Sequence, residues 1–362
     1  MKRVILTTGG TGGHIFPALA VAEALRARFP DCQVLFVGGT YGPEADLAAR
    51  AGLEYVGLPV RGVLGRGLRS VGAAFAMLYG IGSALRIVAR FKPDVVVGFG
   101  GYAAFAAVLA ARLRGCAVAL HEQNSIPGMT NRVLGRLAGR IFLSLPDMAD
   151  AFPAGKTTLT GNPVRESIVR MGNATRGHSS GSRRLLIMGG SLGARAINEA
   201  IMKALPALRD AGVAIWHQTG TADWERVRRC YAENGYTQGR VEAFIDDVAA
   251  AYQWADLVLC RAGATSVAEL AVAGKPSVLV PFPQATHNHQ FHNAQFLASC
   301  GAALVVEQKT FPETDLAGLL ATLLADPDRL ATMGAQARAQ GRPEAAEAVV
   351  DGLLALLDRQ AR

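Results

Sequence analysis

The chain has 362 residues, of which half are hydrophobic and 18% are charged. This composition excludes a disordered chain, and the length exceeds one typical core and suits two domains. The formal charge of +8 belongs to residues 1–162, which hold 17 Lys and Arg against 9 Asp and Glu. We therefore expect an anionic partner there, whether nucleic acid, an acidic lipid or a charged substrate.

In the first half, apolar runs alternate with helical patterns, as in a parallel sheet with crossover helices. Strands are expected at 3–8, 33–38, 54–58, 94–98, 117–120, 140–144 and 157–160. Helices are expected at about 17–28, 44–50 and 129–137, within 61–92, and from 99–102 onward. Pro17 is expected in the first turn of its helix.

The segment 61–92 combines basic and apolar side chains, and a helix of this kind can lie in a membrane interface. Its members are Arg61, Arg66, Arg69, Arg86, Arg90 and Lys92, flanking Leu68, Phe75, Met77, Leu78, Tyr79 and Ile81. The alternative, favoured for most of the helix, is that Phe75, Leu78 and Tyr79 face the core and the arginines are solvated. Only part of this face is then expected to touch lipid.

Residues 161–165 are the expected exit from the first domain, and the polar residues 171–183 suit a surface linker. The pattern then restarts with strand 184–188, glycine-rich loop 189–193 and helix 194–209. Further strands are expected near 213–218, 240–243, 257–260, 277–281 and 303–306. The predicted fold class is α/β, with two similar domains at 1–162 and 163–342. A helix at 343–360 could return to the first domain.

The sequence carries few signals for export, for spanning a membrane or for disulfide formation. A strand at the very start of the sequence leaves no room for a signal peptide, so none is expected. The longest weakly polar stretch, 71–85, is shorter than the ~20 residues that a spanning helix needs. The cysteines are far apart and form no CxxC pair, as is typical of reduced core cysteines in a cytosolic protein. They are Cys32, Cys116, Cys230, Cys260 and Cys300.

Residues 261–269 follow a strand pattern and open a short helix that Gly274-Lys-Pro276 ends. Gly263 is expected to free the backbone for a tight turn, and the start of a helix favours a diphosphate. Glu269 could then accept from two ribose hydroxyls. Alternatively, Ser266 and Glu269 form a capping box, in which Glu269 only bonds back to its own helix. The residues leave both interpretations open.

Ligands of open α/β sheets bind at the carboxyl ends of the strands, where five unusual loops are expected. These loops are 9–14, 99–102, 121–128, 189–195 and 261–269. Neither 9–13 nor 189–193 fits GxGxxG or a Walker A loop, which argues against dinucleotide binding and ATP hydrolysis.

Two residues in these loops could act as a general base. His14 could take a proton from an attacking hydroxyl, or only hydrogen-bond its loop. Glu122 is the other candidate, because burial would raise its pKa; otherwise it ties two loops together. Tyr102 and Asn131 could bind hydroxyls, or only pack and cap a helix.

Metal binding is poorly supported, because no His/Cys cluster has ligand spacing. Asp326-Pro-Asp328 suits an N-cap better than a metal. His287, His289 and His292 do not all share one helix face, and Gln290 looks more useful as a hydrogen-bonding residue. Without a metal, helix starts and side chains such as Arg165 and Ser191 would hold a leaving diphosphate.

Taken together, six motifs resemble those of the MurG family, the bacterial peptidoglycan N-acetylglucosaminyltransferases. They are GGTGGHIFP (9–17), GGY (100–102), HEQN (121–124), GNPVR (161–165), GGSLGAR (189–195) and RAGATSVAE (261–269). The resemblance runs in order from Arg3 to about Gly341. It implies a GT-B fold, two Rossmann-like domains that face each other across a cleft. It also implies inverting transfer of GlcNAc from UDP-GlcNAc to the C4 hydroxyl of MurNAc in lipid I, with no essential metal or cofactor.

The resemblance implies site residues as well. UDP-GlcNAc would contact Thr11, Gly12, Gly13, Asn124, Arg165, Ser191, Ile245, Ala264, Thr265, Ser266, Val267, Ala268, Glu269 and Gln290. The acceptor would contact Gly10, Tyr102 and Asn131, and the base would be His14 or Glu122. The implied location is the anionic cytoplasmic face of the plasma membrane, with other cell-wall synthesis proteins as potential partners and no nucleic acid.

Two features depart from the family pattern. Gly72, Ala76 and Gly82 are small where bulkier apolar residues are expected, which predicts a weaker membrane patch. The polar stretch 171–183 is longer than expected and has no assigned role. The alternative function is that of another GT-B transferase with a lipid acceptor such as diacylglycerol. A third possibility is a nucleotide-sugar-binding regulator without turnover.

Overall fold

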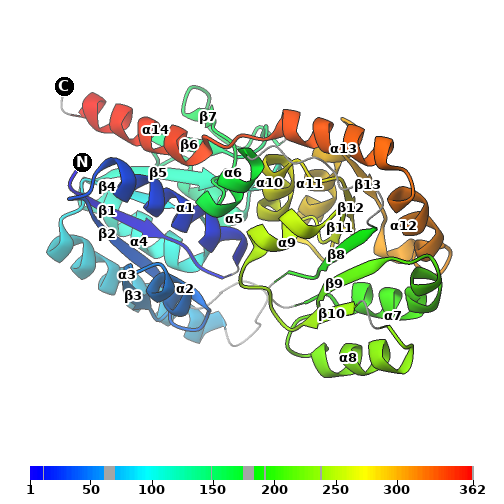
Figure 1. Cartoon of the computed structure of the whole chain (residues 1–362). Helices are drawn as coiled ribbons and strands as arrows, with labels where there is room; N and C mark the ends of the chain where they lie inside the picture. The colour runs from blue at the N-terminus through cyan, green and yellow to red at the C-terminus, as the bar shows by residue number, and fades with distance from the viewer. Residues whose placement is uncertain are drawn as a thin grey trace. The chain divides into compact units, whose positions relative to one another are not determined.

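The chain forms two compact units, Met1–Arg165 with Arg342–Arg362, and Glu166–Gly341. They are called unit 1 and unit 2 below, and Figure 1 shows their elements. The computed structural model describes residues 1–10, 12–60, 70–147, 149–173, 183–190, 193–236 and 239–360. Thr11, Ser191, the arginines at 61, 66 and 69, and most of the predicted linker lie outside these residues.

Unit 1 contains a seven-stranded sheet in the order β3-β2-β1-β4-β5-β6-β7. Every pair of neighbours is parallel, so the carboxyl ends of all seven strands lie at one edge. The strands are β1 (Arg3–Thr7), β2 (Gln33–Gly39), β3 (Glu54–Leu58), β4 (Val95–Gly98), β5 (Ala117–Glu122), β6 (Arg140–Leu143) and β7 (Thr157–Leu159). The order reverses between β1 and β4, which is where ligands of such sheets bind.

Helices cover both faces of this sheet because alternate strand residues point to opposite sides. Val4 and Leu6 pack with α1 (Gly12–Arg28), α2 (Glu44–Arg50) and α14 (Ala345–Gln360). Ile5, between them in sequence, packs with α3 (Ser70–Phe91), α4 (Gly101–Leu113) and α5 (Met129–Leu134). The near-continuous apolar runs of the strands follow from this two-sided burial.

Helix α1 begins at Gly12, so the expected start near Pro17 was wrong. Pro17 lies inside the helix and not in its first turn, although proline removes one helical hydrogen bond. Ile15 explains the earlier start, because its side chain is fully buried in the core of unit 1. Tertiary packing of this kind routinely overrides local propensity.

The expectation that Phe75, Leu78 and Tyr79 face the core was also wrong. They are 68%, 65% and 62% exposed and lie on one stripe of α3, because positions three and four apart share a helix face. The core side of α3 is taken by Ala84 and Val88, which are smaller and sit on the opposite face. Ile81 and Leu85 are partly buried against the same core, so the inward face of α3 is filled without the stripe at Phe75, Leu78 and Tyr79.

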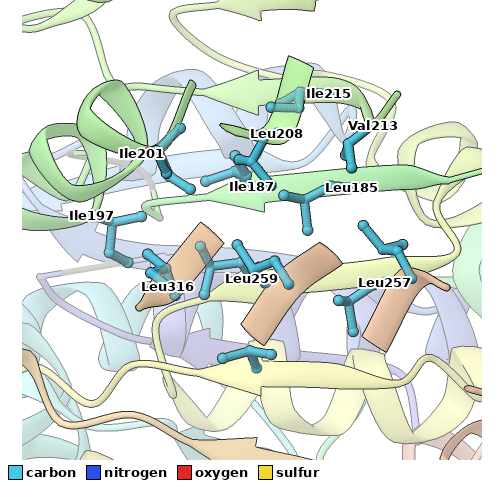
Figure 2. Packing of buried hydrophobic residues seen from close by; sticks show 14 of the residues in the cluster. Leu185, Ile187, Ile197, Ile201, Leu208, Val213, Ile215, Leu257, Leu259 and Leu316 are labelled. Atoms are coloured by element: carbon cyan, nitrogen blue, oxygen red, sulfur yellow. The ribbon is translucent and has the colours of Figure 1, made fainter. Parts of the chain in front are cut away.

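Unit 2 contains a six-stranded sheet, again all parallel, in the order β10-β9-β8-β11-β12-β13. The strands are β8 (Arg184–Met188), β9 (Ala214–Gln218), β10 (Gly239–Glu242), β11 (Leu257–Cys260), β12 (Ser277–Leu279) and β13 (Ala303–Val305). Figure 2 shows the core on one face, which includes Leu185 and Ile187 of β8, Leu257 and Leu259 of β11, and Ile201.

The helices of unit 2 are α6 (Glu166–Asn173), α7 (Arg195–Asp210), α8 (Trp224–Glu233), α9 (Val248–Trp254), α10 (Ala264–Ala273), α11 (His289–Ala298), α12 (Leu316–Leu324) and α13 (Pro327–Gln340). Two short 3₁₀ turns lie at Thr286–Asn288 and Gln308–Thr310. The prediction that Asp326 is an N-cap is confirmed, because its side chain accepts from the backbone N–H of Arg329.

Part of the predicted linker is helical, which corrects the expectation of a surface loop from residue 171. Residues 171–173 are the last turn of α6, and Gly172 is buried against Val272 of α10. A side chain at 172 would meet the Val272 carbonyl, so the glycine permits close helix packing. Over the ranges given above, no helix combines the length and the apolar character needed to cross a membrane.

Candidate functional site

The glycine-rich loop after β1 is held by a buried carboxylate. Gly10 has a φ of 105°, and its backbone N–H donates to Glu44 Oε1 over 2.9 Å. Glu44, on α2, is 1% exposed and lies against Gly42, where any Cβ would meet the carboxylate. Sequence analysis missed Glu44, because the contact joins residues 34 positions apart and the local pattern shows only an acid in a helix's first turn.

The loops after β1 and β4 touch, as their places at the switch point predict. The N–H of Gly9 donates to the carbonyl of Gly100 over 3.0 Å. Gly100 has a φ of 106°, and a Cβ there would lie 3.2 Å from Cε1 of His14. This glycine is therefore needed both for the backbone conformation and for the space that the His14 ring occupies.

His14 is the third residue of α1, and its ring is half-buried. Its Nδ1 lies 2.7 Å from Oε1 of Gln123, just beyond the end of β5. Gln123 was not singled out in the sequence, although its neighbour Glu122 was. The pair brings the loop after β5 to the start of α1.

Glu122 is 2% exposed and closes its own loop. Oε1 accepts from the backbone N–H and the side chain of Asn124, at 3.0 and 3.2 Å. Oε2 accepts from the backbone N–H of Gly128 and from Nδ2 of Asn131, at 3.2 and 2.9 Å. Four donors on one carboxylate match the alternative in which Glu122 ties loop segments together.

The other first-half candidates lie at the same edge of the sheet or beyond it. Asn131 is buried and also donates to the carbonyl of His121, so it braces the loop and is not open to solvent. Tyr102 is 37% exposed and stands near the start of α4. The Arg165 guanidinium stacks over the ring of Phe16, 4.5 Å from its centroid, which fixes the cation beside α1.

In unit 2, helix α10 begins after Gly263, whose φ is −64°. Any residue adopts that conformation, so the expectation that Gly263 frees the backbone for a tight turn was wrong. No side chain caps the helix at Gly263, and the start at Ala264 is the partially positive end of the helix dipole. A Cβ at 263 would have only Ser266 Oγ within reach, at 4.0 Å.

The capping-box interpretation was also wrong, because it requires Ser266 at the N-cap position, which Gly263 occupies. Glu269 lies in the second turn and is 4% exposed. Its Oε2 accepts from the Tyr252 hydroxyl of α9 over 3.1 Å. The acid is thus held within unit 2 by a neighbouring helix.

Further contacts shape the strand ends of unit 2. Gln290 accepts from the backbone N–H of Phe282 over 2.9 Å, which joins α11 to the loop after β12. Ile245 is 3% exposed. Within 264–269, Ser266 and Ala268 are half-buried and the others are buried. Arg261 donates to Gln308, and burial lowers the pKa of its guanidinium.

A second glutamine that the sequence did not reveal supports the loop after β8. Gln218 Oε1 accepts from the N–H of Gly189 over 3.1 Å, and its Nε2 donates to the carbonyls of Gly190 and Ala243. The loop turns at Gly193, with a φ of 76°, where a Cβ would meet the Thr219 carbonyl. In the part of the chain that the structure describes, no three His, Cys, Asp or Glu side chains gather as metal ligands.

Comparison with known proteins adds family matches to this geometry. The glycosyltransferase family 28 N-terminal domain matches residues 4–143, and the family 28 C-terminal domain matches residues 184–349. A relative from Nitratidesulfovibrio vulgaris (strain Hildenborough) is 69% identical over 99% of this chain and 98% of its own length. A relative from Solidesulfovibrio magneticus is 53% identical over 98% of both chains.

Both relatives are named UDP-N-acetylglucosamine–N-acetylmuramyl-(pentapeptide) pyrophosphoryl-undecaprenol N-acetylglucosamine transferase. Among solved structures, Acinetobacter baumannii MurG superimposes with a TM-score of 0.75 and 35% identity. That match covers 98% of this chain and 99% of the other.

Proposed function

This chain belongs to glycosyltransferase family 28 and, within it, to the MurG family, and from that premise we propose its reaction. It transfers GlcNAc from UDP-GlcNAc to the C4 hydroxyl of the MurNAc in lipid I, with inversion, and so makes lipid II. The step belongs to peptidoglycan synthesis, on which the cell wall, cell shape and cell division of bacteria depend. The observation that carries the proposal is 69% identity over nearly the full length of both chains.

The two parallel-sheet units constitute the GT-B fold, and we assign them different substrates. Unit 1 receives the acceptor and meets the membrane, and unit 2 binds UDP-GlcNAc. Charge supports this division, because unit 1 holds 21 Lys and Arg against 13 Asp and Glu, whereas unit 2 holds 16 of each. The acceptor is borne on an undecaprenyl diphosphate and is therefore anionic and membrane-bound.

Helix α10 provides the donor site in unit 2. Its uncapped start offers N–H groups to the diphosphate, and the absence of a side chain at Gly263 leaves that approach open. Glu269 follows in the second turn and accepts from the ribose hydroxyls. Gln290 of α11 and Ile245, in the loop after β10, complete the residues of unit 2 that we assign to the donor, and the helix start neutralises the departing diphosphate.

Inversion needs one displacement. The acceptor oxygen attacks the anomeric carbon, the bond from that carbon to the UDP oxygen breaks, and the hydroxyl proton passes to a base. We assign this base to His14, because Nε2 of its half-buried ring has no hydrogen-bonding role in the contacts described above. Both oxygens of Glu122 already accept two hydrogen bonds each. The scheme uses no metal or other cofactor.

The membrane contact is assigned to the helical layer formed by α3, α4 and α5. Phe75, Leu78 and Tyr79 are exposed on α3, and further along the same stripe stand the exposed Arg86 and Arg90. Exposed large apolar residues continue at Leu113 of α4, at Met129 and Val133 of α5, and at Leu137 just after α5. Apolar side chains beside cations suit the anionic cytoplasmic face of the plasma membrane.

Turnover with defined acceptors tests the reaction. Full-length enzyme is supplied with labelled UDP-GlcNAc and either lipid I or diacylglycerol, and the lipid product is quantified. We expect lipid II from lipid I and no glycolipid from diacylglycerol. Product from diacylglycerol alone would identify the alternative transferase, and UDP-GlcNAc binding without turnover of either acceptor would identify a regulator.

Two variants test the roles. We expect His14→Ala to lower kcat by about 100-fold or more, as for loss of a general base, with little change in the KM for UDP-GlcNAc. Glu269→Ala is expected to raise that KM with a smaller effect on kcat. An unchanged kcat in His14→Ala removes His14 as the base.

A further inference from the structure

Two buried residues of unit 1 have no part in the mechanism above, yet they form a continuous hydrogen-bonded chain to His14. Nδ1 of His14 lies 2.7 Å from Gln123 Oε1, and Gln123 Nε2 lies 3.0 Å from Nδ1 of His121. Nε2 of His121 lies 3.2 Å from the backbone carbonyl of Gly161. His121 and Gln123 are fully or almost fully buried, at 0% and 1% exposed.

Backbone carbonyls fix the direction of every hydrogen bond in this chain. The Gly161 carbonyl can only accept, so Nε2 of His121 carries a hydrogen and Nδ1 of the neutral ring is an acceptor. The Gln123 amide group donates to that Nδ1 and, over 3.1 Å, to the His121 carbonyl. A flipped amide would place its oxygen against the His121 carbonyl, so the orientation of Gln123 is determined independently at this second point.

The orientation of Gln123 also determines the tautomer of His14. With both amide hydrogens of Gln123 used, only its oxygen faces the His14 ring, and that oxygen must accept from Nδ1–H. The tautomer of an imidazole is set by the hydrogen bond that its other nitrogen makes. His14 is therefore held with its proton on Nδ1 and the lone pair on Nε2.

We propose that His121 and Gln123 are positioning residues that hold His14 in the Nδ1–H tautomer, so that Nε2 is available to the acceptor hydroxyl. This assignment rests on the proposed role of His14 as the base. This series of hydrogen bonds delivers no proton of its own. It selects the nitrogen that can accept one, and it fixes the plane of the ring beside Gly100.

The neutral state of His121 supports the proposal. Burial lowers the pKa of His121 to about 4, with a smaller opposing effect from the Gly161 carbonyl. His121 is thus uncharged at neutral pH and can accept from Gln123. A doubly protonated His121 would present a second N–H to the Gln123 amide hydrogens and break the chain.

NMR of the ¹⁵N-histidine-labelled full chain reads the tautomer directly, without substrate and without regard to activity. His14→Ala assigns the His14 signals by their disappearance. We expect neutral His14 to carry its proton on Nδ1, and neutral His121 to carry its proton on Nε2. The opposite tautomer at either ring overturns the proposal, and this measurement on the parent protein needs no variant at Gln123 to fold.

Gln123→Met removes the contacts with both His14 and His121 at similar side-chain length. Gln33→Met is the matched control, because Gln33 is exposed at the start of β2, away from the carboxyl ends of the strands in the same sheet. We expect Gln123→Met to release His14 into a mixture of tautomers and to lower kcat by roughly tenfold or more, with the KM for UDP-GlcNAc unchanged. If the tautomer is released but kcat is unchanged, the base role of His14 fails while the positioning role stands. An unchanged tautomer overturns the positioning role.

Gln123→Glu tests the link to His14 through the pH profile of kcat/KM, which a substitution with only a structural effect would not shift. The new carboxylate still accepts from His14 Nδ1–H, and its charge favours the protonated ring. A base must be unprotonated to act, so the acidic limb of the kcat/KM profile should shift to higher pH. A variant with reduced activity but an unshifted profile argues that Gln123 contributes only packing.

Discussion

The hydroxyl of Tyr252 lies 3.1 Å from Oε2 of Glu269, and both side chains are buried in unit 2. Because this contact orients the carboxylate proposed for the donor ribose, Tyr252→Phe should weaken donor binding while it preserves ring packing. One hydrogen bond to a charged group is worth about 1.5 to 3 kcal/mol, so the KM for UDP-GlcNAc should rise by roughly tenfold or more with little change in kcat.

Tyr236→Phe is the control for this prediction, because Tyr236 is also buried and its hydroxyl donates to the Val213 carbonyl, remote in sequence from α10. It should change stability and leave the KM for UDP-GlcNAc unaltered. Equal KM values for the parent and Tyr252→Phe, alongside a raised KM in Glu269→Ala, would show that Tyr252 does not orient the acid.

The contact between Glu44 and Gly10 predicts an effect on the acceptor. Glu44→Ala leaves the Gly10 N–H without its acceptor and should destabilise unit 1 by about 1 to 3 kcal/mol. The loosened loop should also lower turnover of lipid I more than binding of UDP-GlcNAc. Glu44→Gln keeps an acceptor oxygen and should retain most of both properties.

Unfolding followed by circular dichroism and steady-state kinetics with lipid I as the varied substrate provide the measurements. Glu54→Ala, at an exposed position in β3 of the same unit, is the matched control and should be neutral. A Glu44→Ala enzyme as stable and as active as Glu54→Ala would show that the loop holds its shape without the carboxylate.

The apolar stripe of α3 predicts membrane binding. Replacing Phe75, Leu78 and Tyr79 with Ser should weaken binding to anionic vesicles by at least about tenfold, because burial in the bilayer interface of each large side chain is worth on the order of 1 kcal/mol. Stability should change little, since all three are more than 60% exposed.

Vesicle sedimentation at two salt concentrations separates the apolar and charged contributions. Arg86→Gln with Arg90→Gln should weaken binding mainly at low salt, because salt screens exposed charges. Leu159→Ser, at an exposed position on β7, is the control. Vesicle binding by the triple variant equal to that of Leu159→Ser would remove this face of α3 from the membrane contact.

Because His217 is buried, we expect unit 2 to lose stability in acid. Burial lowers the pKa of its imidazole from 6.5 to about 3, so between these values the unfolded chain binds a proton that the folded unit does not. Stability therefore falls as the pH drops from 6.5 towards 3. The slope of the unfolding free energy contributed by His217 should approach about 1.4 kcal/mol per pH unit near pH 5.

Tryptophan fluorescence follows this unit selectively, because Trp216, Trp224 and Trp254 all belong to it. Denaturant unfolding of the parent and of His217→Gln between pH 4.5 and 6 should give slopes that differ by about that amount. Parallel curves for the two proteins would mean that His217 titrates alike in the folded and unfolded states.

Much of the architecture was predictable because apolar runs bounded by glycine specify buried strands. Strands β8 and β11 and helix α2 occur where expected, to the residue, and the two restarts of the strand–loop–helix pattern mark the two sheets. The loops at the strand ends were also predictable, since parallel topology places them at one edge. The order of the motifs predicted the family.

The errors share a physical cause, which is that tertiary contacts decide what a local pattern leaves open. Helix α3 carries large apolar residues on both its core side and its exposed side, so hydrophobicity alone favoured burial of Phe75. The N-cap of helix α10 is Gly263, three residues before the Ser266 expected in that position. The supporting residues Glu44, Gln123 and Gln218 escaped notice because each bonds across at least 25 positions of sequence.

Helix α14 packs its buried residues Val349, Val350 and Leu353 into the core of unit 1, although it follows all of unit 2 in the sequence. A ribosome must therefore translate the 176 residues of Glu166–Gly341 before this face of the first sheet can be covered. At typical speeds of synthesis that interval lasts about 10 to 35 seconds. During it the nascent first sheet displays an apolar surface, which makes it a target for chaperones, while the second unit is free to fold ahead of the first.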